Sequence, residues 1–225
     1  MPNSRPSPQS ARPGTLSARL RSRNAQMWEQ ALAMRFVREV TDDTVDDDVF
    51  ARYLLFEREF VDTAARLAGA AVREAPGPRA LRGHSDSLHA LVTDQYAYFT
   101  KALETTGVPE TSPRAHEQAS VLTEEALDVA DTLGYPGIVT CMYAAESLYA
   151  TWCATADRSP SARPQVADWV HLHTVAPFTT QVRFLEAEVD ALEILPETET
   201  ELTAVFGRFL AAEVRFHDAA YLDRA

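Results

Sequence analysis

Apolar side chains recur at every third or fourth position along most of the chain, and this helical spacing restricts its fold more than any other feature. Leu32, Phe36, Val37 and Val40 show the pattern within one short stretch. No segment shows the sustained alternation with β-branched residues that a half-buried strand would have. The 225-residue chain also has only 8 glycines, fewer than the many tight turns of a sandwich or barrel require. The sequence therefore predicts an all-α fold.

Proline, glycine and polar residues mark the ends of about seven predicted helices. Ser112 and Pro113 fit an N-cap followed by proline at the first helical position, and Gly107 fits the C-cap of the preceding helix. A break at Ala176-Pro177 is expected to kink the sixth helix. Helices of this length suit a compact two-layer bundle with a central pocket, in which the fifth helix is the buried central one. The predicted helices cover 15–41, about 46–74, 79–106, 112–132, 135–155, 164–193 and 197–223.

The N-terminal segment differs in composition from the rest of the chain. The first 28 residues contain five arginines, several serines and no acidic residue before Glu29. We expect a disordered tail at 1–14 followed by one helical domain at 15–225. The same composition also occurs in organellar transit peptides, whereas the absence of an apolar stretch argues against a secretory signal.

Net charge limits the binding partners that this chain can have, and its cysteine content indicates the cellular compartment. A net charge of −12 and a pI near 4.9 argue against binding to nucleic acid or to an anionic membrane surface. No apolar run reaches the roughly 18 residues that a membrane-spanning helix needs. Two cysteines in a domain of this size are no disulfide framework, so a reducing cytoplasm is the expected location.

Cys141 is the candidate nucleophile because it stands in the most apolar predicted helix. A buried cysteine is usually a small apolar side chain. A reactive thiolate would need a nearby positive group, which free N–H groups at the helix start near Pro136-Gly137 could provide. Cys153, twelve residues further on, is assigned to the core.

Three glutamates stand among apolar residues and are candidate acids or bases. Glu213 follows Phe206 and Phe209 by seven and four residues and therefore shares their inward face. Glu57 follows an aromatic and aliphatic run, and Glu146 is a further candidate for a buried acid. Burial raises the pKa of a carboxyl group toward the range of a general acid or base. An ion pair with an arginine is the structural alternative.

Two carboxylate–histidine pairs indicate a metal site as an alternative. His217 follows Glu213 by four residues and His89 follows Asp86 by three, so each pair lies on one helix face. Helical di-iron sites use such pairs from separate helices. His171 and His173 are expected at the surface or the rim of a pocket. The sequence has no glycine-rich phosphate loop, CxxC, HExxH or GxSxG motif.

Five segments together resemble the TenA/thiaminase II family in order and spacing. None of the five is specific alone, but together they extend from about residue 16 to 222. The segments are Met27-Trp28-Glu29-Gln30-Ala31-Leu32 with Arg35-Phe36-Val37, Tyr53-Leu54-Leu55-Phe56-Glu57, Thr140-Cys141-Met142-Tyr143, Trp169-Val170-His171-Leu172-His173, and Glu213-Val214-Arg215-Phe216-His217-Asp218-Ala219-Ala220.

The resemblance implies a heme-oxygenase-like helical bundle without heme or other cofactor. It implies a homo-oligomer, dimer or tetramer, that hydrolyses the exocyclic amine of a 4-amino-5-aminomethyl-2-methylpyrimidine, a small heterocyclic substrate of thiamine salvage. Cys141 would be the nucleophile, Glu213 the proton carrier and Glu57 the acid that holds the pyrimidine. The remaining substrate-binding residues would be Tyr53, Phe60, Tyr143, Phe216 and His217.

The sequence departs from the family pattern mainly by losing tyrosines. Phe60, Ala145 and Val166 stand where the family has tyrosine, although Tyr143 or Tyr149 could substitute for one of them. His217 replaces a tryptophan. Each lost hydroxyl removes a hydrogen bond to a polar ring. A more apolar pocket is therefore expected, and the alternatives are a different small amine or heterocycle as substrate, a di-iron oxidase on the same scaffold, or a ligand-binding protein without catalysis.

Overall fold

Side-chain caps begin several helices of the computed structural model, which describes residues 14–223. The Ser112 hydroxyl accepts a hydrogen bond from the Ala115 amide at 3.2 Å, as the sequence predicts. The Asp46 carboxylate accepts one from the Asp48 amide at 2.9 Å. Both caps satisfy amides that have no partner within the helix. The tail predicted at 1–14 lies outside the described residues, apart from Gly14.

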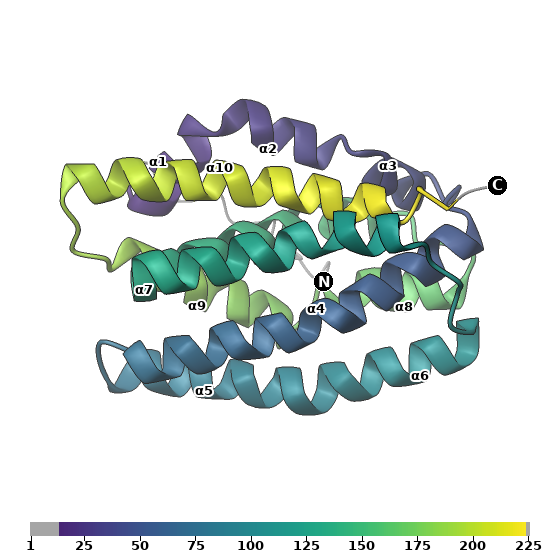
Figure 1. Ribbon diagram of the computed structural model, residues 1–225, viewed down its shortest axis with the longest axis horizontal. Coiled ribbons are helices and arrows are strands. Elements are labelled where there is room, and N and C mark those ends of the chain that lie inside the picture. The colour runs from purple at the N-terminus through teal and green to yellow at the C-terminus, as the bar shows by residue number, and fades with distance from the viewer. Residues whose placement is uncertain (1–13, 224–225) are drawn as a thin grey trace, which may run out of the picture.

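The described residues form ten α-helices and one π-helix, which confirms the all-α prediction (Figure 1). In chain order these are α1 (Leu16–Arg23), α2 (Ala25–Leu32), α3 (Arg35–Thr41), α4 (Asp47–Glu74), α5 (Pro78–Ala90), η1 (Leu91–Gln95), α6 (Tyr96–Thr106), α7 (Pro113–Ala156), α8 (Pro164–Leu172), α9 (Phe178–Asp190) and α10 (Pro196–Ala219).

Two of the seven predicted helices are broken into shorter ones. The first divides into α1, α2 and α3, and the Asn24 side chain at the first break donates hydrogen bonds to the carbonyls of Leu20 and Thr203. This contact holds the break against α10. The sixth is not a kinked helix but two helices, α8 and α9, on either side of Pro177.

Helix α7 reverses direction at Gly134. This residue has φ 55° and ψ −142°, outside the helical region. Before it, Thr63 of α4 faces Thr123 at 3.2 Å; after it, Glu57 of α4 accepts a hydrogen bond from Tyr149. Glu74, at the end of α4, lies against Gly134. The segment 113–133 therefore runs along α4 in the same direction, and the segment 135–156 returns.

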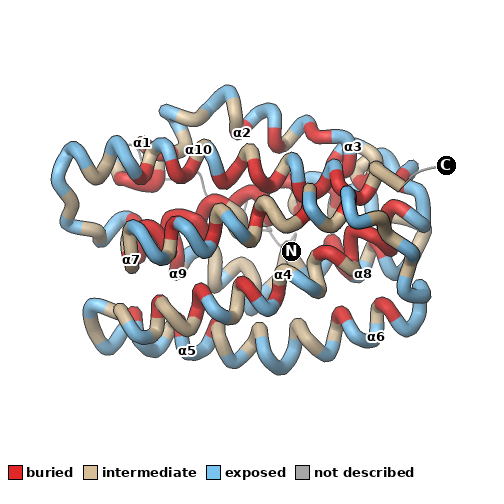
Figure 2. Tube along the Cα trace, in the orientation of Figure 1, coloured by how far each residue is buried: buried red, intermediate tan, exposed pale blue. Residues whose placement is uncertain are grey.

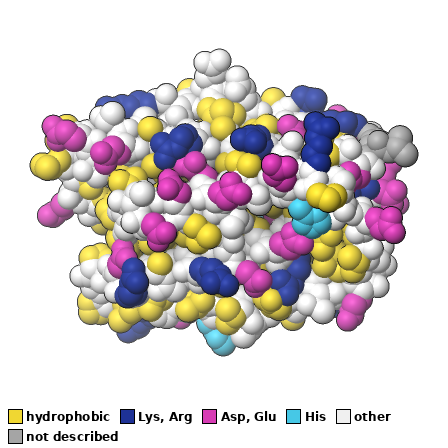
Figure 3. Space-filling model, in the orientation of Figure 1, with side chains coloured by type: hydrophobic (Ala, Val, Ile, Leu, Met, Phe, Trp, Pro, Cys, Tyr) yellow, Lys and Arg dark blue, Asp and Glu magenta, His cyan; other side chains and the backbone are white. Residues whose placement is uncertain are grey.

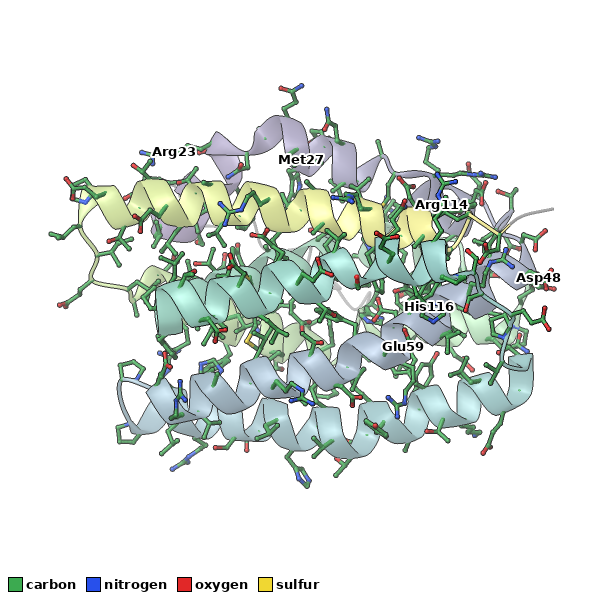
Figure 4. The ribbon with its side chains drawn as sticks, viewed as in Figure 1. Arg23, Met27, Asp48, Glu59, Arg114 and His116 are labelled. Atoms are coloured by element: carbon green, nitrogen blue, oxygen red, sulfur yellow. The ribbon has the colours of Figure 1, made fainter. Side chains whose placement is uncertain are left out.

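Figure 4 shows the same register on the outer face. Glu59 of α4 and His116 of α7 point toward each other, with an Oε1–Nε2 distance of 3.3 Å. Because Thr63 faces Thr123 further along both helices, this pair shows that α4 and the first half of α7 run parallel. The return segment 135–156 is thereby placed behind the first half, where it is buried on nearly all sides.

We expect Gly134→Ala to lower the free energy of unfolding by about 1–3 kcal/mol, because a side chain at this φ and ψ is strained. An added Cβ would also stand 2.9 Å from Glu74 Oε2. Gly69→Ala is the matched control, since Gly69 is helical and a Cβ there meets nothing within 4 Å. That control should be neutral or stabilising. Urea unfolding of both variants measures the difference, and equal stabilities would contradict the assignment of a strained turn.

The helices pack in layers around the return segment of α7. In Figure 1, α4 and the continuous α5–η1–α6 run side by side, α7 and α10 lie above them, and α2 and α3 cover α10. Buried residues follow the inner faces of these helices (Figure 2). The face in Figure 3 shows acidic and basic side chains interspersed. Among the described helices, none is both long and apolar enough to cross a membrane.

Candidate active site

Three glutamates from three helices are brought together in the core: Glu57 of α4, Glu146 of α7 and Glu213 of α10. Burial is the largest cause that raises the pKa of each one, and it raises the pKa of Glu146 to about 8. The charge of Glu57 raises the pKa of the other two, and Glu146 adds to the effect on Glu213. Such repulsion acts over several ångströms, and Tyr149 and His217 link Glu57 to the backbone of Glu213, so the three side chains are neighbours. The three carboxyl groups therefore form one acid centre.

Two tyrosines hold Glu57 in place. The Tyr53 hydroxyl donates to Glu57 Oε1 at 2.7 Å, and the Tyr149 hydroxyl donates to the same oxygen at 2.5 Å. The two hydroxyl oxygens are 3.2 Å apart. These hydrogen bonds lower the pKa of Glu57 and oppose the effect of burial. Glu57 is thus the anchored member of the acid centre.

His217 connects Tyr149 to α10 as a neutral imidazole. Burial lowers the pKa of His217 to about 4, so it carries no charge at neutral pH. Its Nδ1 lies 2.8 Å from the carbonyl oxygen of Glu213, which places the proton on Nδ1. Nε2 is then an acceptor and lies 3.3 Å from the Tyr149 hydroxyl, whose single proton can go to this nitrogen or to Glu57 but not to both.

Glu146 and Glu213 each present an unpaired oxygen. In the described part of the chain, Oε2 of each glutamate is shielded from solvent and has no hydrogen-bond partner. The His217 Nδ1 is 3.8 Å from Glu213 Oε2, too far for a hydrogen bond. An unpaired buried carboxyl oxygen is costly unless it is protonated or bound by a ligand. These two oxygens are the unsatisfied carboxyl oxygens of the acid centre.

Aromatic rings cover one side of the acid centre. Trp152 and Trp169 stack with ring centroids 5.4 Å apart, and Tyr149 packs against both. The ring centroid of His173 lies 4.3 Å from that of Trp169 and 4.6 Å from that of Phe178. His173 is half-buried among these rings, which agrees with the predicted rim position, and burial lowers its pKa to about 4. His171 is exposed, as predicted.

Most of the predicted site residues lie together. Tyr53, Glu57, Glu213 and His217 belong to the acid centre or contact it directly. Phe216 is buried beside them, with its ring centroid 6.3 Å from that of Tyr53 and 6.1 Å from that of Phe60. Phe60 is half-buried and packs against Phe216 from α4.

The charges that act on Cys141 and Tyr143 of α7 are not those of the acid centre. The pKa of Cys141 is raised by burial and then by Glu125, with Arg208 opposing. Glu125 and Arg208 form an ion pair of 2.9 Å between the first half of α7 and α10. The charges that act on this thiol are thus not those of the acid centre. Tyr143 is held near α1, where Ser17 and Arg21 lower its pKa against the effect of burial.

Helix periodicity explains the separation. Five residues rotate a helix by about 140° beyond a full turn, so Cys141 and Glu146 face different neighbours. The residue one turn before Glu146 on the same face is Met142, which has a thioether and no thiol. Cys153, one turn after Tyr149, continues that face, and the charge of Glu57 contributes to raising its pKa.

Tyr149 belongs to the acid centre but was not among the predicted site residues. It donates to Glu57, faces His217 and packs on Trp152. A signal was present, because Glu146 and Tyr149 are polar groups one turn apart on the most apolar helix. Two such groups on a buried face indicate a shared polar partner.

The metal alternative requires two pairs to converge, and they do not. Asp86 and His89 are exposed on α5, whereas Glu213 and His217 are buried on α10. Within residues 14–223, no three His, Cys, Asp or Glu side chains are grouped to hold a metal ion. The arrangement of side chains thus does not favour the di-iron alternative.

Two surface cavities lie outside the acid centre. One of about 420 Å³ lies between α3 and the end of α7, lined by Leu32, Val37 and Trp152 among others. The second, of about 230 Å³, is lined by residues that include Asp47 and Arg163. Neither cavity is lined by the three glutamates.

Solved structures of TenA proteins have the same fold. A TenA homologue from Pyrococcus furiosus superposes with a TM-score of 0.82 at 20% identity, over 92% of this chain and 100% of that one. A TenA family transcription regulator from Silicibacter sp. TM1040 superposes with a TM-score of 0.82 at 16% identity, over 93% of this chain and 97% of that one. A TenA-like thiaminase from Sulfolobus solfataricus superposes with a TM-score of 0.72 at 15% identity, over 90% of this chain and 94% of that one. The predicted all-α, TenA-type bundle is confirmed. No protein-family model and no curated protein matches the sequence.

Proposed function

We propose that this chain is a hydrolase that cleaves a C–N bond of a small protonated aminopyrimidine bound at the acid centre. The observation that supports it is the convergence of Glu57, Glu146 and Glu213 within a TenA fold, with two of their oxygens unpaired. Raised pKa values keep protons on carboxyl groups near neutral pH, which suits general acid catalysis.

The roles follow from the environment of each acid. Glu57, held by Tyr53 and Tyr149, accepts hydrogen bonds from the exocyclic amine or ring N–H of the pyrimidine. Glu213 is fully buried and protonated, and it gives its proton to the amine that leaves. Water supplies the new C–O bond, so that the amine departs as ammonia and the alcohol remains.

Ammonia release from 4-amino-5-aminomethyl-2-methylpyrimidine tests the proposed reaction. We expect turnover of this compound and formation of the corresponding hydroxymethyl pyrimidine. A purified, folded protein that binds the pyrimidine without releasing ammonia would overturn the hydrolase and favour the ligand-binding alternative.

Two mechanisms are compatible with this hydrolysis, and they differ in the nucleophile. In the first, the Cys141 thiolate attacks the pyrimidine, as the family resemblance implies. In the second, a carboxylate of the acid centre activates water directly. The surroundings of Cys141, with Glu125 and Arg208 as its charged neighbours and a raised pKa, favour the second mechanism.

We therefore expect Cys141→Ser to keep turnover within about threefold of the parent protein, since a residue away from the reacting atoms contributes little beyond packing. Cys153→Ser is the matched comparison, because both thiols are fully buried and free. The kcat of ammonia release measures the effect. A loss of three orders of magnitude in Cys141→Ser alone would establish the thiolate mechanism instead.

A further inference from the structure

The imidazole of His217 is held in one orientation and one tautomer. It is 0% exposed, and its ring centroid lies 5.1 Å from that of Tyr53 and 5.2 Å from that of Phe36. Its Nδ1 donates to the carbonyl oxygen of Glu213 at 2.8 Å. Nε2 therefore keeps its lone pair, and the hydroxyl within reach of that lone pair is that of Tyr149, 3.3 Å away.

The Tyr149 hydroxyl has one proton and two acceptors. In the structure the shorter contact is the 2.5 Å hydrogen bond to Glu57 Oε1, an oxygen that also accepts from Tyr53 at 2.7 Å. His217 Nε2 is the second acceptor. Rotation of the O–H bond transfers the hydrogen bond from Glu57 to His217 while the heavy atoms stay in place, and no covalent bond breaks.

We propose that His217 is a positioning residue of the acid centre, which accepts the Tyr149 proton when the Glu57 carboxylate is protonated or occupied by an N–H group of the ligand. The inference rests on the proposed function for the role of Glu57 in holding the pyrimidine. A ligand N–H then replaces Tyr149 at Glu57, and His217 satisfies the displaced hydroxyl. Without an acceptor at this position, the buried hydroxyl either loses its hydrogen bond or competes with the ligand for Glu57.

The titratable groups that face Glu57 come from α4, α7, α10 and the end of α8. They are Tyr53, Glu146, Tyr149, Cys153, His173, Glu213 and His217. Burial raises the pKa of the two tyrosines and the thiol well above their ordinary values, and it lowers the pKa of the two histidines to about 4. None of these five groups therefore changes its charge between pH 5 and 8. Below pH 7 the other two glutamates keep their protons, since burial raises their pKa as well.

A second buried histidine provides the matched control. His84 Nε2 lies 3.0 Å from the hydroxyl of Tyr135, which donates to Glu188 Oε2 at 2.7 Å. Within the described residues, His84 Nδ1 has no hydrogen-bond partner, so Nε2 is free to carry the proton and donate to Tyr135. This histidine does not compete for the tyrosine proton. His84→Phe and His217→Phe thus each remove a buried imidazole beside a tyrosine, but only the second removes a competing acceptor.

Carbon-13 NMR of the glutamate carboxyl carbons measures the pKa of Glu57 without requiring turnover, and Glu57→Gln assigns its signal. We expect His217→Phe to lower the pKa of Glu57 by about half to one unit, because the protonated form loses the alternative partner of Tyr149. His217→Gln, which keeps an acceptor oxygen, should restore the pKa toward that of the parent, and His84→Phe should leave it unchanged. An unchanged pKa of Glu57 in a folded His217→Phe variant would overturn the inference.

A double variant assigns the effect to Tyr149. In the Tyr149→Phe background, His217→Phe should no longer shift the pKa of Glu57. An equal shift with and without Tyr149 would mean that His217 acts through packing alone, which rejects the inference. Nitrogen-15 NMR of the parent protein gives a result that no substitution affects. It should show His217 protonated on Nδ1 and bare on Nε2 down to about pH 5, and a proton on Nε2 at neutral pH would be incompatible with the proposed role.

The pH dependence of ammonia release connects this inference with the proposed function. Glu57 must be ionised to hold the pyrimidine, so kcat/KM falls as pH falls through its pKa. In His217→Phe this acid limb should move to lower pH by the same amount as the NMR titration. A shifted Glu57 titration without ammonia release by the parent would retain the role of His217 and reject the hydrolase. Hydrolysis by the parent with an unshifted Glu57 in His217→Phe would do the reverse.

Discussion

Glu213→Gln is expected to lower the kcat of C–N hydrolysis by about 10²–10⁴, the range that a positioned general acid contributes. Glutamine keeps the shape of the protonated side chain but cannot give up a proton to the leaving amine. Glu213 is 1% exposed, and its pKa is raised by burial and then by Glu57 and Glu146. No other acid on α10 has this environment, since Glu197, Glu199 and Glu201 lie at its first turns and Asp218, near its end, is exposed.

A readout beyond turnover distinguishes catalysis from structure. Glu213→Gln should retain the melting temperature within a few degrees, because a neutral amide replaces a neutral carboxyl group. Single-turnover ammonia release at saturating aminopyrimidine isolates the chemical step, and Glu201→Gln serves as the surface control. Unchanged single-turnover rates in Glu213→Gln would remove this residue from the mechanism.

Glu146→Gln is expected to stabilise the protein by about 3 kcal/mol at pH 8 and by almost nothing at pH 4. In the folded protein the pKa of Glu146 is about 8, against an ordinary value of 4.5. Above pH 4.5 the unfolded chain therefore releases a proton that the folded protein keeps. The contribution of Glu146 to the free energy of unfolding therefore falls as pH rises to about 8. Glutamine does not titrate, so the variant does not lose this free energy.

The magnitude allows for partial contact with solvent. A shift of one pKa unit corresponds to about 1.4 kcal/mol, but Glu146 is half-buried and water reduces the effect. Urea unfolding at several pH values measures the difference. Glu124→Gln, at an exposed position on the same helix, is the control and should show no such pH dependence. A difference between Glu146→Gln and the parent that is constant with pH would contradict the raised pKa.

The comparison with TenA structures shows how far the fold tolerates sequence change. At 11–20% identity the superpositions still cover 90% or more of this chain. Many different residues can form an apolar helix face or a helix cap, which explains why the fold persists at low sequence identity. The acid centre has no such freedom, because each carboxyl group depends on its neighbours for its protonation state.

Local signals in the sequence determined the helical segments and their inward faces. The caps at Ser112 and Gly107, the apolar stripes, and the burial of Glu213 among Phe206 and Phe209 were all predictable from residues a few positions apart. Glu57 was predictable in the same way. Each of these features depends on interactions within one helix, where spacing alone decides which residues share a face.

Only the tertiary structure decided which helix faces meet. The reversal at Gly134 turns the segment 135–156 so that Tyr149 donates to Glu57 and the charge of Glu57 acts on Glu146, whereas the charges that act on Cys141 are those of Glu125 and Arg208. One residue rotates a helix by about 100°, so the position of a side chain along a helix decides which neighbouring helix it faces. The rotation of a buried helix is set by packing against all its partners together, and that information is distributed over the whole chain.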